Sequence, residues 1–200
     1  MNRNDPRVIK TLRQIDDALL TCLKTTSQQK LTVDMLCETA LINRSTFYKY
    51  YLDKYDLLEN YLERMLNEFK EQADCEFVTA TADTIDDDHY ISSFGNLLTF
   101  ISDHREQYQT IWRADIDRNI YEEMTMVIHH SIYEQMLHTV SDDKKKRAYC
   151  DYYAYLFSSN VMALVHWWFM NDTIISMRDA RQIMAEIMRD GLFVAFKNAL

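Results

Sequence analysis

Apolar residues recur at helical spacing along most of the chain. Near the start they occupy positions 8, 9, 12, 15, 19 and 22–23, which lie on one face of a helix of about five turns. After a polar break at 25–29, Thr32 precedes a second apolar face formed by Val33, Leu36, Cys37 and Ala40. Threonine is a preferred N-cap residue, because its hydroxyl oxygen accepts a hydrogen bond from an N–H that the first turn leaves unpaired. The pattern predicts two amphipathic helices.

Two more helices are predicted directly after these. Asn43 is a candidate N-cap for a short helix that extends to about Tyr50. Asp53 is a candidate N-cap for a long helix, and Asp56 in its first turn places negative charge at the positive end of the helix dipole. The apolar stripe of this fourth helix continues to Phe69, which predicts that one of its faces is buried.

The rest of the chain predicts further helices after a polar connection at 79–88. Ser141 and Ser176 are candidate N-caps, and Asp179 follows the second serine at the spacing of a capping box. No segment repeats with the period of a solenoid. The predicted fold is all-α with about nine helices, the later ones at about 88–102, 104–113, 117–139, 143–171 and 177–197.

The composition supports a helical fold. The 200 residues include two glycines and one proline, whereas average usage gives about 14 and 10. Tight β-turns rely on glycine, so the composition strongly disfavours a hairpin-rich sheet protein. Two separated glycines also cannot build a Gly-rich phosphate loop. Apolar residues make up 48% of the chain, which is enough for a substantial core.

The sequence carries no membrane or disulfide signal. Its longest near-apolar run, 161–170, is too short to cross a bilayer. No apolar region of a secretion signal follows the first basic residues. The four cysteines are far apart and form no C-x-x-C pair. We expect a soluble, cytoplasmic protein with reduced thiols and no membrane partner.

Charge is unevenly distributed along the chain, whose net charge is −9. Residues 1–66 contain ten Lys or Arg and nine Asp or Glu, whereas residues 67–200 contain twelve and twenty-two. An acidic chain does not favour non-specific nucleic-acid binding as its main activity, but its near-neutral first third can still present a local positive surface. We predict two functional regions, residues 1–66 and residues 67–200.

The second and third predicted helices have the spacing of a helix-turn-helix. Steps of 100° along the third helix place Phe47 and Tyr51 on one side and Ser45 and Lys49 roughly opposite. Side chains that flank the polar side, or are long enough to reach it, are Arg44, Thr46 and Tyr48. Hydroxyls and cations are the groups that contact phosphates and base edges when a recognition helix lies in a major groove. The pattern fits a DNA-binding region and an ordinary polar surface of a helix equally well.

The segment 30–58, KLTVDMLCETALINRSTFYKYYLDKYDLL, resembles the DNA-binding domain of the TetR (tetracycline-repressor-like) family. The family pattern joins a Thr-capped second helix, a short turn, a recognition helix ending in Thr-Phe-Tyr-x-x-Phe/Tyr, and x-x-Lys-x-x-Leu. The matching residues are Thr32, Thr46-Phe47-Tyr48, Tyr51, Lys54 and Leu57. The family usually has glycine in the turn where this chain has Leu41, and leucine with a positive φ is strained by roughly 1 kcal/mol or more. Either the turn takes another shape or the strain is tolerated.

The resemblance implies a set of DNA contacts and a dimer. Backbone phosphates would be held by Thr32, Tyr48, Tyr50 and Lys54, and the groove would be faced by Arg44, Ser45, Thr46 and Lys49. TetR-like proteins dimerise through their last two long helices, here about 143–171 and 177–197. A homodimer would then read a palindromic operator in double-stranded DNA, with half-sites about 34–36 Å apart or at a related spacing.

The resemblance also implies a cavity for a small-molecule effector, of unknown identity, within residues 67–200. Methionine suits an adaptable pocket, and the chain has eleven. Candidate lining residues are Trp112, Met124, Met126, His129, Tyr133, Met136 and Met162. Any one of them is more often a core residue than a ligand contact. Adjacent histidines point about 100° apart on a helix, so no metal shared by His129 and His130 is expected.

The resemblance implies a ligand-responsive transcriptional repressor. The effector would favour a conformation whose two recognition helices no longer match the half-site spacing. Two alternatives are a transcriptional activator of the same kind and a TetR-like helical co-regulator that acts through protein–protein contacts without binding DNA. The sequence has no nucleophile elbow, no H-E-x-x-H pair and no cysteine cluster. We therefore expect no enzyme activity, no catalytic residues and no cofactor.

Overall fold

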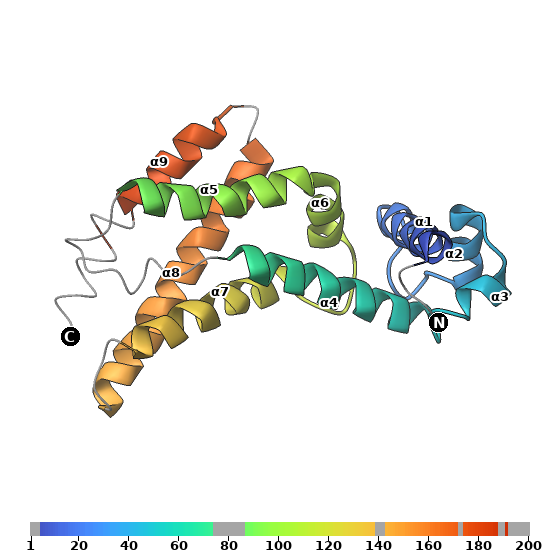
Figure 1. Cartoon of the computed structure of the whole chain (residues 1–200), viewed down its shortest axis with the longest axis horizontal. Helices are drawn as coiled ribbons and strands as arrows, with labels where there is room; N and C mark the ends of the chain where they lie inside the picture. Colours follow the sequence, from blue (N-terminus) through green and yellow to red (C-terminus); the bar gives the residue numbers. More distant parts are fainter. Residues whose placement is uncertain (1–4, 74–86, 139–142, 172–173, 188–190, 192–200) are drawn as a thin grey trace. The chain divides into compact units, whose positions relative to one another are not determined.

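The computed structural model describes residues 5–73, 87–138, 143–171, 174–187 and 191. Within these ranges all regular structure is helical (Figure 1). The nine helices found there are α1 (Pro6–Leu23), α2 (Val33–Ala40), α3 (Arg44–Phe47), α4 (Lys54–Gln72), α5 (Asp87–Asp103), α6 (Arg105–Arg113), α7 (Ile120–Leu137), α8 (Lys144–Asn171) and α9 (Met177–Ile187). The predicted all-α fold is confirmed.

The chain divides into two compact units, which are described separately. The N-terminal unit comprises Met1–Met65 and His104–Ile120, and the C-terminal unit comprises Leu66–Asp103 and Tyr121–Leu200. Helix α6 therefore belongs with α1 to α3, although it follows α5 in the sequence. The predicted division of function between residues 1–66 and residues 67–200 stays a prediction.

Helices α1, α2, α4 and α6 contribute the core of the N-terminal unit, and α1 contacts both α2 and α6. The apolar face of α1 is buried as its periodicity predicts. Fully buried side chains of this unit include Ile15, Leu19, Leu31, Leu36, Phe47, Leu57 and Leu62. Each buried side chain of this size stabilises the fold by about 1.5–3 kcal/mol. At the surface Arg64 on α4 pairs with Asp16 on α1 at 2.8 Å.

Side-chain caps fix where α2 and α4 begin. The Met35 N–H donates to the Thr32 hydroxyl oxygen at 3.2 Å. The N–H groups of Tyr55 and Asp56 donate to the Asp53 carboxylate at 2.8 and 2.9 Å. Both predicted caps are confirmed, and each satisfies N–H groups that a helix start would otherwise leave unpaired.

The helix after Asn43 differs from its prediction in two respects. Asn43 occupies the N-cap position, but its side chain makes no capping hydrogen bond. The α-helix ends at Phe47 rather than near Tyr50, because the N–H groups of Lys49 and Tyr50 donate to carbonyls three residues back. The last turn is therefore tighter than an α-helical turn.

In the C-terminal unit α9 contacts both α5 and α8. The α8 helix is buried along much of its length, including Ala154, Phe157, Val161, Met162 and Phe169. The predicted capping box at the start of α9 is confirmed, since the Ser176 N–H donates to Asp179 at 3.3 Å and the Asp179 N–H donates to the Ser176 hydroxyl at 3.2 Å. The cap of α8 is Asp143, whose carboxylate accepts from the N–H groups of Lys145 and Lys146.

Several predicted features lie outside the described residues. These are the cap Ser141, most of the connection at 79–88 and the end of the last predicted helix after Ile187. Among the described residues, no helix is both long enough and apolar enough to span a membrane.

Candidate nucleic-acid interface

The turn between α2 and α3 is made by a leucine in the left-handed region. Leu41 has φ 55° and ψ 43°, and it is the only non-glycine residue with positive φ in the described chain. The Leu41 N–H donates to the Glu38 carbonyl at 3.3 Å, and the Ile42 N–H donates to the Cys37 carbonyl at 3.0 Å. These bonds satisfy carbonyls at the end of α2. The chain therefore keeps the turn shape that glycine would allow and tolerates the strain.

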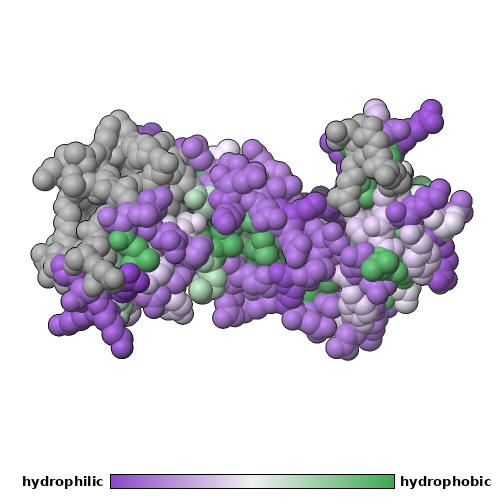
Figure 2. All heavy atoms as spheres, turned by 60° about the horizontal axis from the view of Figure 1, so that its bottom comes forward, coloured by the Kyte–Doolittle hydropathy of each residue, from purple (hydrophilic) through white to green (hydrophobic). Residues whose placement is uncertain are grey.

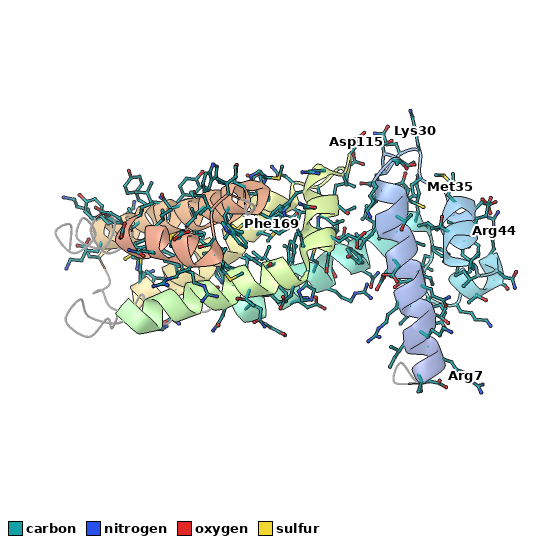
Figure 3. The ribbon with its side chains drawn as sticks, turned by 90° about the horizontal axis from the view of Figure 1, so that it is seen from above. Arg7, Lys30, Met35, Arg44, Asp115 and Phe169 are labelled. Atoms are coloured by element: carbon teal, nitrogen blue, oxygen red, sulfur yellow. The ribbon has the colours of Figure 1, made fainter. Side chains whose placement is uncertain are left out.

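The polar and aromatic sides of α3 separate as the helical spacing predicts. Phe47 is fully buried and Tyr51 is nearly so, with their ring centroids 5.8 Å apart. Arg44, Ser45 and Lys49 are exposed. Figure 3 shows Arg44 at the outer edge of the N-terminal unit, with its side chain directed away from α1. The aromatic side holds the short helix in place, while the hydroxyl and cationic side is accessible to a partner.

The Arg44 guanidinium is held by groups from two helices. Its Nη1 donates to both carboxylate oxygens of Asp34 on α2, at 2.9 and 3.1 Å. Its Nη2 donates to the Tyr48 hydroxyl at 3.2 Å. The hydrogen bond with Tyr48 and the charge of Asp34 raise the pKa of Arg44 above its ordinary value. Arg44 is therefore a fixed cation at the start of α3.

The other predicted contact residues lie around this cation on the same unit. Thr32 is exposed, although its hydroxyl already accepts the capping hydrogen bond of α2. Tyr48 is exposed, whereas Thr46 and Tyr50 are half-buried. The contacts predicted for these side chains stay predictions.

Lys54 makes contacts that its predicted phosphate role did not include. Its Nζ donates to the backbone carbonyls of Gln28, Gln29 and Leu31 at 2.9, 2.9 and 2.7 Å. An ammonium group has three N–H donors, so these carbonyls use all of them. A phosphate contact by Lys54 would require one of these bonds to break.

The loop at 27–31 also binds the segment that follows α6. The Gln28 N–H donates to the Asp115 carbonyl at 2.9 Å. The Asp117 N–H donates to the Gln28 side-chain oxygen, also at 2.9 Å. Figure 3 labels Lys30 and Asp115 on these two neighbouring loops. Sequence reasoning missed this contact and the Asp34–Arg44 pair, because no periodicity relates residues 89 or ten positions apart on different elements.

An open groove of about 570 Å³ lies beside the end of α1. It is lined by Leu23, Lys24, Arg105, Glu106, Gln109, Thr110 and Arg113. Lys24 and Glu106 form an ion pair within it. None of these residues was a candidate from the sequence.

The predicted effector residues fall in different surroundings. Trp112 is on α6 of the N-terminal unit. In the C-terminal unit Met162 is fully buried and Met126 is exposed. His129 stacks on Tyr133 with ring centroids 6.0 Å apart, and its Nε2 lies 3.0 Å from Asp151. Within the C-terminal unit the described contacts thus bring together His129 and Tyr133.

Three solved structures are similar to this chain. A protein of Pseudomonas aeruginosa PAO1 described as a transcriptional regulator has a TM-score of 0.67 at 17% identity, over 99% of this chain and 97% of that one. The fatty acid degradation regulator FadR of Bacillus halodurans has a TM-score of 0.58 at 16% identity, over 91% and 96%. The dihydroxyacetone kinase operon activator DhaS has 0.55 at 16%, over 95% and 98%. No curated protein matches the sequence significantly.

These likenesses show that the chain shares the helical fold of the three proteins, and its class, a transcriptional regulator rather than an enzyme, follows from a family model. A TetR-family sequence profile, described as the C-terminal region of a transcriptional regulator, matches residues 88–190, slightly more than half of the chain. The chain belongs to the TetR family. The resemblance of its segment 30–58 to the family's DNA-binding domain is independent of that match, which lies entirely C-terminal to it.

Proposed function

We propose that this protein binds double-stranded DNA in a sequence-specific manner and that α3 enters the major groove. One observation carries the proposal. The segment of α3 and the tight turn after it buries the rings of Phe47 and Tyr51 on one side. Its other side exposes Arg44, Ser45 and Lys49. Residues at the N-terminal end of a recognition helix are the ones that reach base edges. Thr46 would join these three in facing the groove.

Phosphate contacts would surround this helix. Thr32 lies at the N-terminus of α2, where backbone N–H groups and the helix dipole favour an anion. Tyr48 and Tyr50 offer phenol hydroxyls close to α3. Lys54 takes part only if DNA displaces a carbonyl from its ammonium group, so we propose it as a residue that positions the loop at 27–31.

A homodimer would present two such interfaces to a palindromic operator. The exposed side of α8 supports this proposal, because apolar side chains recur there at helical spacing. Four of its large side chains remain exposed, namely Tyr152, Tyr155, Trp167 and Met170. On the face drawn in Figure 2, hydrophilic residues cover most of the described surface and apolar ones form small groups. A second copy of the chain would cover the α8 stripe.

We further propose a cytoplasmic repressor that a small effector releases from DNA. Within the C-terminal unit the candidate contacts to the effector are Met126, His129, Tyr133 and Met162. An effector can shift the DNA-binding equilibrium only through unequal affinity for the two conformations. The neighbour DhaS is described as an activator, so activation of transcription is the alternative to the repression proposed here. A reporter gene behind the bound promoter, with and without the regulator, measures that sign directly.

DNA binding is tested by fluorescence anisotropy with duplexes selected from a library whose central 20 or so base pairs are randomised. The parent protein should select a near-palindrome. Lys49→Ala should weaken binding of that duplex and reduce the slope of log affinity against log salt by about one unit. Failure of the parent to bind any duplex at low salt would contradict the proposal.

The second candidate, a co-regulator that contacts proteins, is favoured by two leucines of the N-terminal unit. Leu41 and Leu52 are 87% and 83% exposed, so both apolar side chains are available to the apolar core of an interface with a protein partner. The absence of DNA binding by the parent, together with retained dimerisation, would favour this candidate.

A further inference from the structure

We propose that Asp34 is a positioning residue that orients Arg44 toward the edge of a guanine base, and so sets base preference without touching DNA. This inference rests on the DNA-binding function proposed above. It begins from the contact between α2 and α3, where the Nη1 group of Arg44 meets both oxygens of the Asp34 carboxylate at 2.9 and 3.1 Å. The Tyr48 hydroxyl, one turn further along, accepts a hydrogen bond from Nη2 of Arg44. The centroid of the Tyr48 ring lies 5.8 Å from the guanidinium carbon.

Folding stability does not explain this arrangement. The side chains of Arg44 and Asp34 are 58% and 60% exposed, and ion pairs with this exposure contribute little to the free energy of unfolding. An arginine also loses much rotamer freedom when it is held in one conformation. What the contacts do provide is a guanidinium whose position is set before a partner arrives, which lowers the entropic cost of binding that partner.

Enough donors remain for a base. A guanidinium has five N–H donors in a planar fork. The described contacts of Arg44 use its Nη1 group and one hydrogen of Nη2, and they leave Nε–H and the other Nη2 hydrogen. Guanine presents two adjacent acceptors, O6 and N7, in the major groove, and arginine is the side chain that most often binds both. Guanine is therefore the base that the remaining donors fit.

The charge of Asp34 increases the preference for guanine over non-specific binding to DNA. Its carboxylate lies two residues after Thr32, close to the proposed phosphate contact, where a negative charge opposes binding to any DNA. The same carboxylate offsets the attraction of Arg44 for phosphates in general. Arg44 then adds to affinity mainly where a base with matching acceptors stands opposite it, which is the property of a specificity residue.

The test compares the parent with Asp34→Asn, which keeps the size of the side chain and removes its charge. Each protein selects duplexes from the randomised library. The preference for guanine at one position of each half-site should fall about ten-fold in Asp34→Asn. Affinity for a scrambled duplex should rise several-fold, and its salt slope should steepen by about 0.9, because Arg44 becomes free to contact a phosphate.

Glu38→Gln is the matched control. Glu38 is exposed one turn further along α2 and makes no described contact with Arg44, and this substitution changes the net charge by the same amount. It should leave the base preference at every position as in the parent. A change of preference in both variants would overturn the inference, since charge alone would then explain it.

A double-mutant cycle links the effect to Arg44. In an Arg44→Ala background the preference for guanine should already be lost, and Asp34→Asn should not change it further. Arg44→Lys keeps the charge but not the planar fork, so it should also lose the preference while it retains most of the scrambled-duplex affinity. Helix content by circular dichroism, unchanged from the parent, shows that these exposed substitutions leave the fold intact.

The outcomes separate this inference from the function on which it rests. If the parent selects a sequence and Asp34→Asn shows the same base preference and the same salt slope, the role of Asp34 is overturned while DNA binding stands. A parent that binds no duplex overturns DNA binding, and the role of Asp34 with it.

Discussion

Leu41 is a residue whose backbone conformation suits glycine better than leucine. A leucine in the left-handed region costs about 1–2 kcal/mol, and Leu41 is 87% exposed, so its side chain gains little from burial. Glycine at this position costs about 0.5–1 kcal/mol in the entropy of the unfolded chain. We expect Leu41→Gly to raise the free energy of unfolding by about 0.5–1 kcal/mol, measured by denaturant unfolding with circular dichroism.

Leu52→Gly is the control for this substitution. Leu52 is 83% exposed, but its φ is not positive. Glycine there relieves no strain and should lower the free energy of unfolding by about 0.5–1 kcal/mol. An equal loss of stability in both variants would mean that the turn at Leu41 stores no strain.

Lys54 and Lys49 have different roles, although both are lysines close to α3. Lys54→Ala should lower the free energy of unfolding by about 1–3 kcal/mol, because three carbonyls of the loop at 27–31 lose a charged donor. Lys49→Ala should leave stability unchanged, since Lys49 is exposed. In salt titrations of DNA binding Lys49→Ala should have the larger effect. It should reduce the slope of log affinity against log salt by about one unit, whereas Lys54→Ala should leave that slope unchanged. Equal reductions of the slope would show that DNA draws Lys54 away from its carbonyls.

At the scale of elements, Gly95 allows α5 to lie close against an arginine of α9. A Cβ added at Gly95 would come 2.6 Å from both Cζ and Nε of Arg181. The Arg181 guanidinium also donates to the Gly95 carbonyl at 3.2 Å and to the Thr99 hydroxyl at 3.1 Å. We expect Gly95→Ala to push this flexible side chain aside and to break its hydrogen bonds with Gly95 and Thr99. Alanine favours a helix by about 1 kcal/mol over glycine, which offsets part of that loss, so the free energy of unfolding should fall by no more than about 1 kcal/mol. Thermal and denaturant unfolding measure this change.

Two comparisons make this measurement specific. In an Arg181→Ala background the added methyl group meets no guanidinium, so Gly95→Ala should become neutral or stabilising, because alanine favours a helix by about 1 kcal/mol over glycine. Gly191→Ala is a second control, since no atom of the described residues lies within 4 Å of a Cβ at that position. If the penalty at Gly95 persists without Arg181, the close approach of the two side chains is not its cause.

At the scale of the whole molecule, the proposed dimer predicts that one charge on α8 separates the subunits. Ala163 is exposed and lies within the apolar stripe between Tyr155 and Trp167. Ala163→Glu would bring two like charges together across a two-fold axis. Light scattering should give the mass of one chain, 23.9 kDa, instead of two. Affinity for the full palindrome should fall about 100-fold or more, while affinity for a half-site stays the same.

His130→Glu is the control for the dimer experiment. His130 is an exposed residue of α7, outside the α8 stripe. This variant should keep the mass of the dimer and its affinity for the palindrome. A monomeric parent would contradict the proposed dimer directly.

The sequence by itself determined the helices, most of their caps and the two-sided character of α3. These features depend on residues close together in the chain: the spacing of apolar side chains, the hydroxyl of Thr32 and the carboxylate of Asp53 act within one or two turns. For the same reason the aromatic side of α3, with Phe47 and Tyr51, could be predicted as buried.

Only the tertiary structure decided which groups meet across elements. The pairing of Asp34 with Arg44, the three carbonyls around Lys54 and the place of Arg181 beside Gly95 each depend on how separate helices pack. The shape of the turn at Leu41 was likewise open, because leucine disfavours a positive φ and local preference argues against the conformation that the fold adopts. Packing energy summed over many buried side chains exceeds such local preferences, and the sequence pattern does not show where this happens.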